Sequence, residues 1–313
     1  MSGDDSTPTC RASRSPASVQ EIVLCASITS IAGPIVRWAA RCSTGAASGR
    51  SAGSSDAHGL VLVDTGYGLR DVAHPHRRPD PRITLPWRAM LNIRLHERET
   101  AIRQVEALGY RADDVRHIVA THLDFDHAGG LEDFPNATIH VMAREYDDAT
   151  GPRAGIVARN RWRPRQLDAV RHWRRYGAEG EAWFGFDAVR DLEGLPPEIL
   201  MVPLPGHTWG HTGVAVRKSD ERWLLHAGDA YFYRGEMRQA RRRSTPGVRA
   251  YQRLMEVDAT ARLRALSIER RDPVELERCQ AVRRGGADLA EVTESMWPPT
   301  PRFQTTAAPN IGG

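Results

Sequence analysis

The chain has 313 residues, of which 41% are hydrophobic and 26% are charged, with a formal net charge of +4 and a sequence pI of about 9.1. These values are typical of a globular protein with one large domain or two modest ones. The basic balance permits contact with anions without requiring nucleic acid. The four cysteines form no CxxC pair, which argues against a structural zinc ribbon and against a disulfide framework.

The longest apolar run, residues 22–36, contains Ser, Thr, Gly and Pro and is short for a membrane span. Acidic residues precede it where a signal peptide needs basic ones. We therefore expect a cytoplasmic protein with no membrane contact, and a first strand at 21–31. Residues 1–20 should be disordered because they offer little to bury. One domain is expected over 21–282, followed by a loose tail at 283–313.

The hydrophobic pattern beyond this run predicts further short strands, in chain order 60–63, 117–121, 137–142, 199–204, 213–216 and 223–226. Helices are predicted at 99–108, from Ala143 and at 251–266. The first of these has Thr100 as a candidate cap and Gly109 as a stop. Strands that alternate with helices indicate helices packed on a sheet.

Residues 151–190 differ in character, because eight arginines lie between Arg153 and Arg175 and three tryptophans lie nearby. No regular apolar period covers the segment. It could be a solvated helical excursion whose tryptophans bury against the core, or a basic insertion. We favour an insertion near the entrance of a functional site.

The stretch at 118–131 reads IVATHLDFDHAGGL. After a short apolar strand it presents four metal-ligand types within six positions: His122, Asp124, Asp126 and His127. Gly129 and Gly130 then let the backbone turn tightly at small steric cost. Imidazole and carboxylate are ordinary ligands of zinc and iron. Because four such side chains would repel one another without a cation, we expect a metal site here.

Later strand ends offer His207 in LPGHTWGH and Asp229 in HAGDAYF, each beside a glycine. THLDFDHAGG resembles the HxHxDH signature of the metallo-β-lactamase superfamily, and LPGHTWGH, HAGDAYF and LVDTG resemble its other motifs. The resemblance covers roughly 21–279 and is nearest to the quorum-quenching lactonase-like subgroup. It implies an α+β fold, an αββα sandwich of two mixed β-sheets flanked by helices.

The resemblance also implies a ligand set: His122, Asp124 and His207 at a first metal, Asp126 and His127 at a second, and Asp229 bridging both. The implied cofactors are two divalent metals, zinc in first place, with iron or manganese as alternatives. Asp126 would act in catalysis by orienting a metal-held hydroxide. The implied function is a metal-dependent hydrolase that cleaves an ester, lactone or thioester of a small molecule.

Two departures from the family pattern keep other readings open. Asp124 stands where the family usually has histidine, which makes the site more anionic and favours iron or manganese. Arg271 stands where the family places the last histidine of the second metal, so that second site could be weak. The alternative is therefore a degenerate, non-catalytic member. A nucleic-acid hydrolase is disfavoured, since such members usually carry an additional large domain.

Other polar residues near these motifs have structural readings. Asp64, in LVDTG, is expected to organise the loop by hydrogen bonds rather than to touch metal. His211 is expected to support a ligand, and His226 to lie in the core or to support a ligand. Phe232 stands where lactonases of the family have a substrate-contacting tyrosine. The sequence assigns neither the substrate nor the oligomeric state.

Overall fold

A computed structural model describes residues 18–28, 34–43, 59–75, 95–152, 161–217, 223–230 and 274–277, together with 82, 83, 85, 88, 93, 158 and 159. Only the backbone is described for the first two ranges and for 274–277. All of these residues belong to one compact unit, Met1–Ala281. The predictions that concern Phe232, Arg271, the helix at 251–266 and the tail at 283–313 lie outside the described residues.

The first sheet has six strands in chain order: β1 (Ser18–Ile28), β2 (Pro34–Ser43), β3 (Leu60–Val63), β4 (Val115–Val119), β5 (Thr138–Met142) and β6 (Trp173–Tyr176). The pairs β1–β2 and β2–β3 are antiparallel, and the pairs from β3 to β6 are parallel. β3 is buried along its whole length, as expected of a strand covered on both faces.

The second sheet also has six strands: β7 (Glu181–Trp183), β8 (Phe186–Asp191), β9 (Ile199–Pro203), β10 (Thr212–Arg217), β11 (Trp223–His226) and β12 (Val274–Glu277). Its neighbours are antiparallel except β11 and β12, which are parallel. Because β9 and β11 both pair antiparallel with β10, their carboxyl ends lie at the same edge of the sheet.

In the described part of the chain, the helices that connect strands of the first sheet are α1 (Leu69–Ala73), α3 (Ala101–Ala107) and α4 (Ala143–Thr150). Single 3₁₀ turns, η1 to η4, occur at Glu97–Glu99, Ala112–Asp114, Leu131–Asp133 and Pro164–Gln166. The predicted stop at Gly109 is confirmed by its φ of +86°. Leu108, at the C-terminal end of α3, is 47% exposed. None of the helices among the described residues has the length and apolar character needed to cross a membrane.

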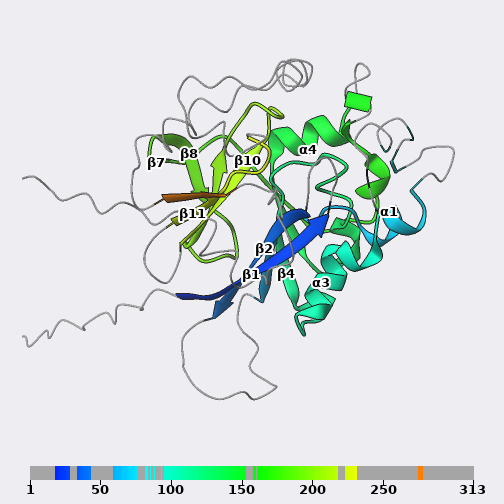
Figure 1. The fold of residues 1–313 in the computed structure, drawn as a ribbon. Helices are drawn as coiled ribbons and strands as arrows, with labels where there is room; N and C mark the ends of the chain where they lie inside the picture. The colour runs from blue at the N-terminus through cyan, green and yellow to red at the C-terminus, as the bar shows by residue number, and fades with distance from the viewer. Residues whose placement is uncertain are drawn as a thin grey trace, which may run out of the picture. The chain divides into compact units, whose positions relative to one another are not determined.

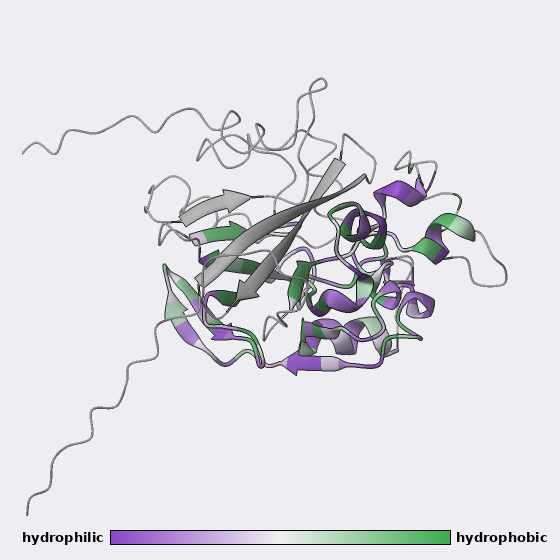
Figure 2. Ribbon diagram, turned by 90° about the horizontal axis from the view of Figure 1, so that it is seen from below, coloured by the Kyte–Doolittle hydropathy of each residue, from purple (hydrophilic) through white to green (hydrophobic). Residues whose placement is uncertain are grey.

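Two hydrophobic layers enclose the first sheet. One lies between the sheets and joins Val61 and Val119 to Met201 and Val214. The other joins the opposite face of the first sheet to α3 and α4, and Figure 1 shows α3 on the side of that sheet away from β10 and β11. The helices carry both hydrophilic and hydrophobic residues (Figure 2), as expected of helices with one buried face. The arrangement confirms the α+β class and the two mixed sheets.

The segment at 151–190 is not an insertion as a whole. It supplies β6 to the first sheet and β7 and most of β8 to the second. Several of its arginines make internal contacts: Arg174 pairs with Glu193 at 3.2 Å and Arg175 with Asp147 at 3.6 Å. The sequence pattern also missed β2, α1 and β12, which are short or contain charged residues.

Candidate metal centre

All six candidate ligands gather where strands of the two sheets end. The loop after β4 carries four of them, His207 follows β9, and Asp229 follows β11. His122, His127 and His207 are at most 2% exposed. The side chains of Asp229 and Asp126 are the more accessible ones, at 13% and 26%. The structure thus brings together residues that are more than 100 positions apart in the chain.

The ligand atoms stand at separations that a shared cation would explain. These are His122 Nε2 to Asp124 Oδ2, 3.5 Å; His207 Nε2 to Asp229 Oδ2, 3.7 Å; His127 Nε2 to Asp229 Oδ2, 3.6 Å; and His127 Nε2 to Asp126 Oδ2, 4.0 Å. Such distances are too long for hydrogen bonds. Two ligands of one tetrahedral zinc, with bonds of about 2.1 Å, lie about 3.4 Å apart.

Buried polar atoms without hydrogen-bond partners support the same conclusion. His122 Nε2 and Asp229 Oδ1 are both in this state. Leaving such atoms unpaired is costly, and a bound cation would remove that cost. His122, His207 and Asp229 each offer a ligand atom within 4.8 Å of the others. The donor set of imidazole and carboxylate therefore fits a divalent cation.

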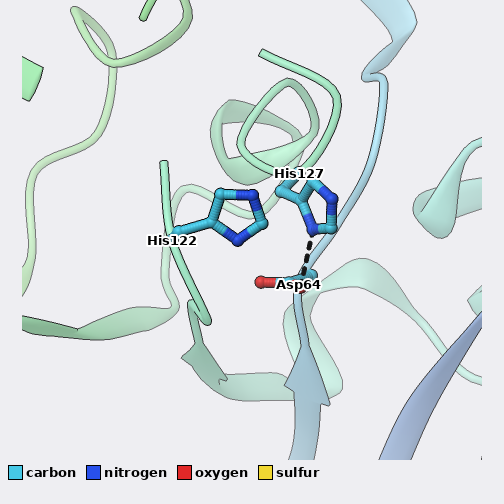
Figure 3. A group of neighbouring side chains, drawn as sticks. All are labelled: Asp64, His122 and His127. Carbon is cyan, nitrogen blue, oxygen red and sulfur yellow. Dashed lines mark hydrogen bonds and ion pairs between the residues drawn. The ribbon is translucent and has the colours of Figure 1, made fainter. Parts of the chain in front are cut away.

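Asp64 orients two of the histidines rather than facing the cation position. Its carboxylate accepts hydrogen bonds from Thr121 N at 2.8 Å, from Thr121 Oγ1 at 2.7 Å and from His127 Nδ1 at 2.9 Å. Figure 3 shows the contact with His127. Since the Thr121 hydroxyl donates to Asp64, it accepts from His122 Nδ1 at 2.9 Å. Both histidines then carry their protons on Nδ1, which leaves Nε2 free to bind metal.

His211 supports the candidate ligand Asp229 through its backbone, as the sequence suggested. Its Nδ1 donates to Leu204 O at 2.9 Å, and its Nε2 accepts from the backbone N–H of Asp229 at 3.0 Å. Both ring nitrogens are therefore occupied, so His211 positions Asp229 instead of binding metal. His226 is buried, 2% exposed, at the end of β11.

The electrostatics of the metal-free site favour a neutral His122 and a charged His127, and His127 must lose its Nε2 proton before it can bind a cation. Burial, assisted by the neighbouring His127, lowers the pKa of His122 to about 4. Burial would also lower the pKa of His127, but the carboxylates of Asp229, Asp64 and Asp126 outweigh it and raise that pKa well above its usual value. Burial and the nearby carboxylates raise the pKa of Asp126 to about 6.

Glu145, which the sequence reading missed, joins three parts of the site. Its Oε1 accepts from Leu123 N at 2.8 Å and from Trp162 Nε1 at 3.2 Å. Its Oε2 accepts from Thr208 Oγ1 at 2.5 Å. The side chain thus ties α4 to the loop of His122, to the loop of His207 and to the 161–166 segment. A lone glutamate in a helix gives no sequence signal for such a role.

Arg161 is the second residue that the sequence reading did not place in the site. Its guanidinium Nε lies 2.7 Å from Asp124 Oδ1, and the side chain is almost fully buried. Burial would raise the pKa of Asp124, but the Arg161 charge, with help from His122 and His207, outweighs it and holds that pKa well below its usual value. In the metal-free structure Arg161 thus offsets the negative charge that Asp124 adds to the site. A buried carboxylate in place of histidine could have signalled a nearby cation.

Replacing Asp64 with Asn should disturb the two histidines it orients. Asn tolerates the left-handed backbone at this position, where φ is +55°. Its NH₂ group would donate where the carboxylate accepts, turning the Thr121 hydroxyl towards His122 and moving both imidazole protons to Nε2. We expect zinc affinity to fall about 10- to 100-fold, measured by calorimetric titration. Unchanged affinity would show that Asp64 does not set these protonation states.

Comparison with known proteins gives matches to metal-dependent hydrolases. A protein named probable metallo-hydrolase from Mycobacterium tuberculosis is 44% identical over 179 residues, covering 57% of this chain and 55% of that protein. The N-acyl homoserine lactonase AttM of Azorhizobium caulinodans is 29% identical over 178 residues, covering 56% and 61%. The chain thus matches little more than half the length of these curated relatives.

A crystal structure of a quorum-quenching N-acyl homoserine lactone lactonase is 17% identical, with 82% of this chain and 87% of that chain covered and a TM-score of 0.49. A TM-score below 0.5 carries no conclusion about this chain. The family model described as metallo-beta-lactamase superfamily matches residues 56–276, more than half of the chain. The chain therefore belongs to the metallo-β-lactamase superfamily.

Proposed function

We propose that the protein is a metal-dependent hydrolase that opens lactones or cleaves esters or thioesters of small molecules. The observation that carries the proposal is the cluster of histidines and carboxylates with ligand-atom separations of 3.5–4.0 Å. The lactonases among its relatives support N-acyl homoserine lactones as the first substrates to examine. Two divalent metals are proposed, with zinc the first to test.

His122, Asp124 and His207 would hold one metal, Asp126 and His127 the other, with Asp229 between them. When bound, such metals lower the pKa of water and polarise a substrate carbonyl oxygen. Asp126 is the most exposed of the candidate carboxylates, with 26% of its side chain accessible at the edge of the proposed metal positions. We assign to it the orientation of the attacking water and the receipt of its proton.

The test is hydrolysis of N-acyl homoserine lactones, simple esters and thioesters by protein loaded with zinc, iron or manganese, with metal content measured on each sample. Asp126→Asn should lower kcat about 10²- to 10⁴-fold. Asp133→Asn is a matched control, because burial also raises the pKa of Asp133, to about 7, while its carboxylate accepts from Leu69 N outside the site. The control should keep wild-type activity.

A non-catalytic binding protein is the second candidate. It is favoured by Arg161, which contacts two of the proposed ligands, and by Arg271 at the position of the family's last histidine. Absence of turnover on the whole panel with metal bound would support this candidate. Turnover that is lost in Asp126→Asn and kept in Asp133→Asn would exclude it.

A further inference from the structure

Arg161 is a buried cation placed on the ligands of the proposed first metal. Its side chain is 7% exposed. Nε lies 2.7 Å from Asp124 Oδ1 and 2.9 Å from Asp124 Oδ2, and Nη2 lies 2.9 Å from His207 Nε2. One planar guanidinium therefore spans two residues to which a metal would have to bind.

The two uses of His207 exclude each other. An imidazole nitrogen carries either a proton or one lone pair. His207 Nε2 lies 2.9 Å from Arg161 Nη2 and 2.8 Å from Asp124 Oδ2, so it either accepts from the guanidinium with its lone pair or, when protonated, donates to the carboxylate. A metal needs the same lone pair and therefore displaces either contact. A carboxylate has several lone pairs, so Asp124 could serve both cations. The conflict lies at His207.

We propose that Arg161 is an internal competitor for the first metal position, and that a divalent metal binds His207 only after displacing the Arg161 guanidinium. The inference rests on the metal site assigned under the proposed function. It adds that the metal-free protein holds a cation of its own at that site. Arginine keeps its charge at all ordinary pH values, so the metal and not a proton must drive the exchange.

The exchange must be a side-chain movement, because the backbone around Arg161 is tied to the metal-binding loop. Phe125 N donates to Arg161 O at 3.2 Å, and Gln166 Nε2 donates to Phe125 O at 2.9 Å. Trp162 Nε1 donates to Glu145 at 3.2 Å. After displacement the guanidinium therefore stays tethered beside the site.

If Arg161 competes with the metal, removing it should lower the stability of the metal-free protein and raise its metal affinity. Without Arg161, Asp124 loses its buried cation and keeps only the contact with His207 Nε2 at 2.8 Å, which destabilises the metal-free protein. The same change frees His207 for metal. An arginine that only supported the site would, when removed, lower both the stability of the metal-free protein and its metal affinity.

The experiment titrates Zn²⁺ into the chelator-stripped full chain by calorimetry and records thermal unfolding in excess chelator. Arg161→Gln should bind zinc at least tenfold more tightly than wild type and melt at a lower temperature without metal. Arg161→Lys keeps a charge near Asp124 but lacks the planar fork, so it should fold and also bind zinc more tightly. Arg163→Gln is the control, because Arg163 is equally buried and donates to Arg159 O at 3.2 Å.

The control should keep wild-type zinc affinity. If wild type binds zinc and both Arg161 variants bind it no more tightly, the inference is wrong while the proposed metal site stands. If neither wild type nor any variant binds zinc, the metal site and the inference fail together. Tighter binding in Arg163→Gln as well would show a general charge effect and would also overturn the inference.

Discussion

Gly68→Ala should destabilise the protein strongly, although it adds only one methyl group. A Cβ at Gly68 would lie 2.3 Å from the carbonyl oxygen of Gly129, and 2.9 Å from both the Gly129 carbonyl carbon and Gly130 Cα. All three are backbone atoms of the loop after β4, which carries four of the candidate ligands, so no side-chain rotation relieves the overlap. Overpacking of this kind costs about 3 kcal/mol, which chemical denaturation would measure.

The loss should be purely steric. Gly68 has φ −91° and ψ 176°, a conformation that any residue adopts. Gly177→Ala is the matched control, since its Cβ would lie 2.4 Å from a carboxylate oxygen of Glu179, whose side chain is 85% exposed and can move away. The control should change stability by no more than about 0.5 kcal/mol. Equal losses in both variants would contradict the explanation.

Gly129 and Gly130 lie in a turn, as predicted, but the loop needs them for an additional reason. They were expected to permit a tight turn. Neither glycine has a positive φ. A Cβ at Gly129 would lie 1.9 Å from Asp71 Oδ2 and 2.8 Å from Gly66 O. They are needed for close approach to the 64–71 segment, a contact that spacing within one motif cannot reveal.

Strands made of continuous apolar residues could be predicted from the sequence. Strands that are held in place mainly by pairing with a neighbouring strand could not. β3, β9 and β11 lie within a residue of their predicted positions, because Leu, Val, Ile and Met dominate the first two and Trp-Leu-Leu opens the third. β6 has the sequence WRRY and gains its place by pairing parallel with β5. Such an edge strand carries too little apolar signal to be distinguished from an arginine-rich loop.

The candidate site divides in the same way. Residues with metal-ligand chemistry could be picked out because histidine and aspartate stood beside glycine at strand ends. Glu145 and Arg161 could not, because each acts through contacts with residues far along the chain. Glu145 meets Thr208, 63 positions away, and only the folded chain makes that partner known.

Glu145→Ala should cost at least about 3 kcal/mol and weaken the site, because it removes the acceptor for three groups. Leu123 N, Trp162 Nε1 and Thr208 Oγ1 all donate to this carboxyl group. A buried donor left unpaired costs about 1–3 kcal/mol. Denaturation of the metal-free variant, followed by zinc titration, would measure both effects. A loss below about 1 kcal/mol would mean that water replaces the carboxyl group.

Glu145→Gln separates the hydrogen bonds from the charge. Burial raises the pKa of Glu145 to about 7, so the folded protein holds this proton more tightly than the unfolded chain does. The stability that the protonated group provides is complete below pH 4.5 and is lost as the pH rises towards 7. Gln can accept from Leu123 N and donate to Thr208 Oγ1 at every pH.

Between about pH 5 and about pH 8, wild type should therefore lose stability relative to Glu145→Gln, measured as the difference between their free energies of unfolding. Measuring both proteins in excess chelator removes the pH dependence of metal binding. Other carboxyl groups with a raised pKa, such as Asp133, contribute equally to both proteins, so their contributions cancel in the difference. A difference that does not change with pH would show that Glu145 is ionised throughout. The carboxylate would then accept the three hydrogen bonds as an anion, and burial would not raise its pKa into the neutral range.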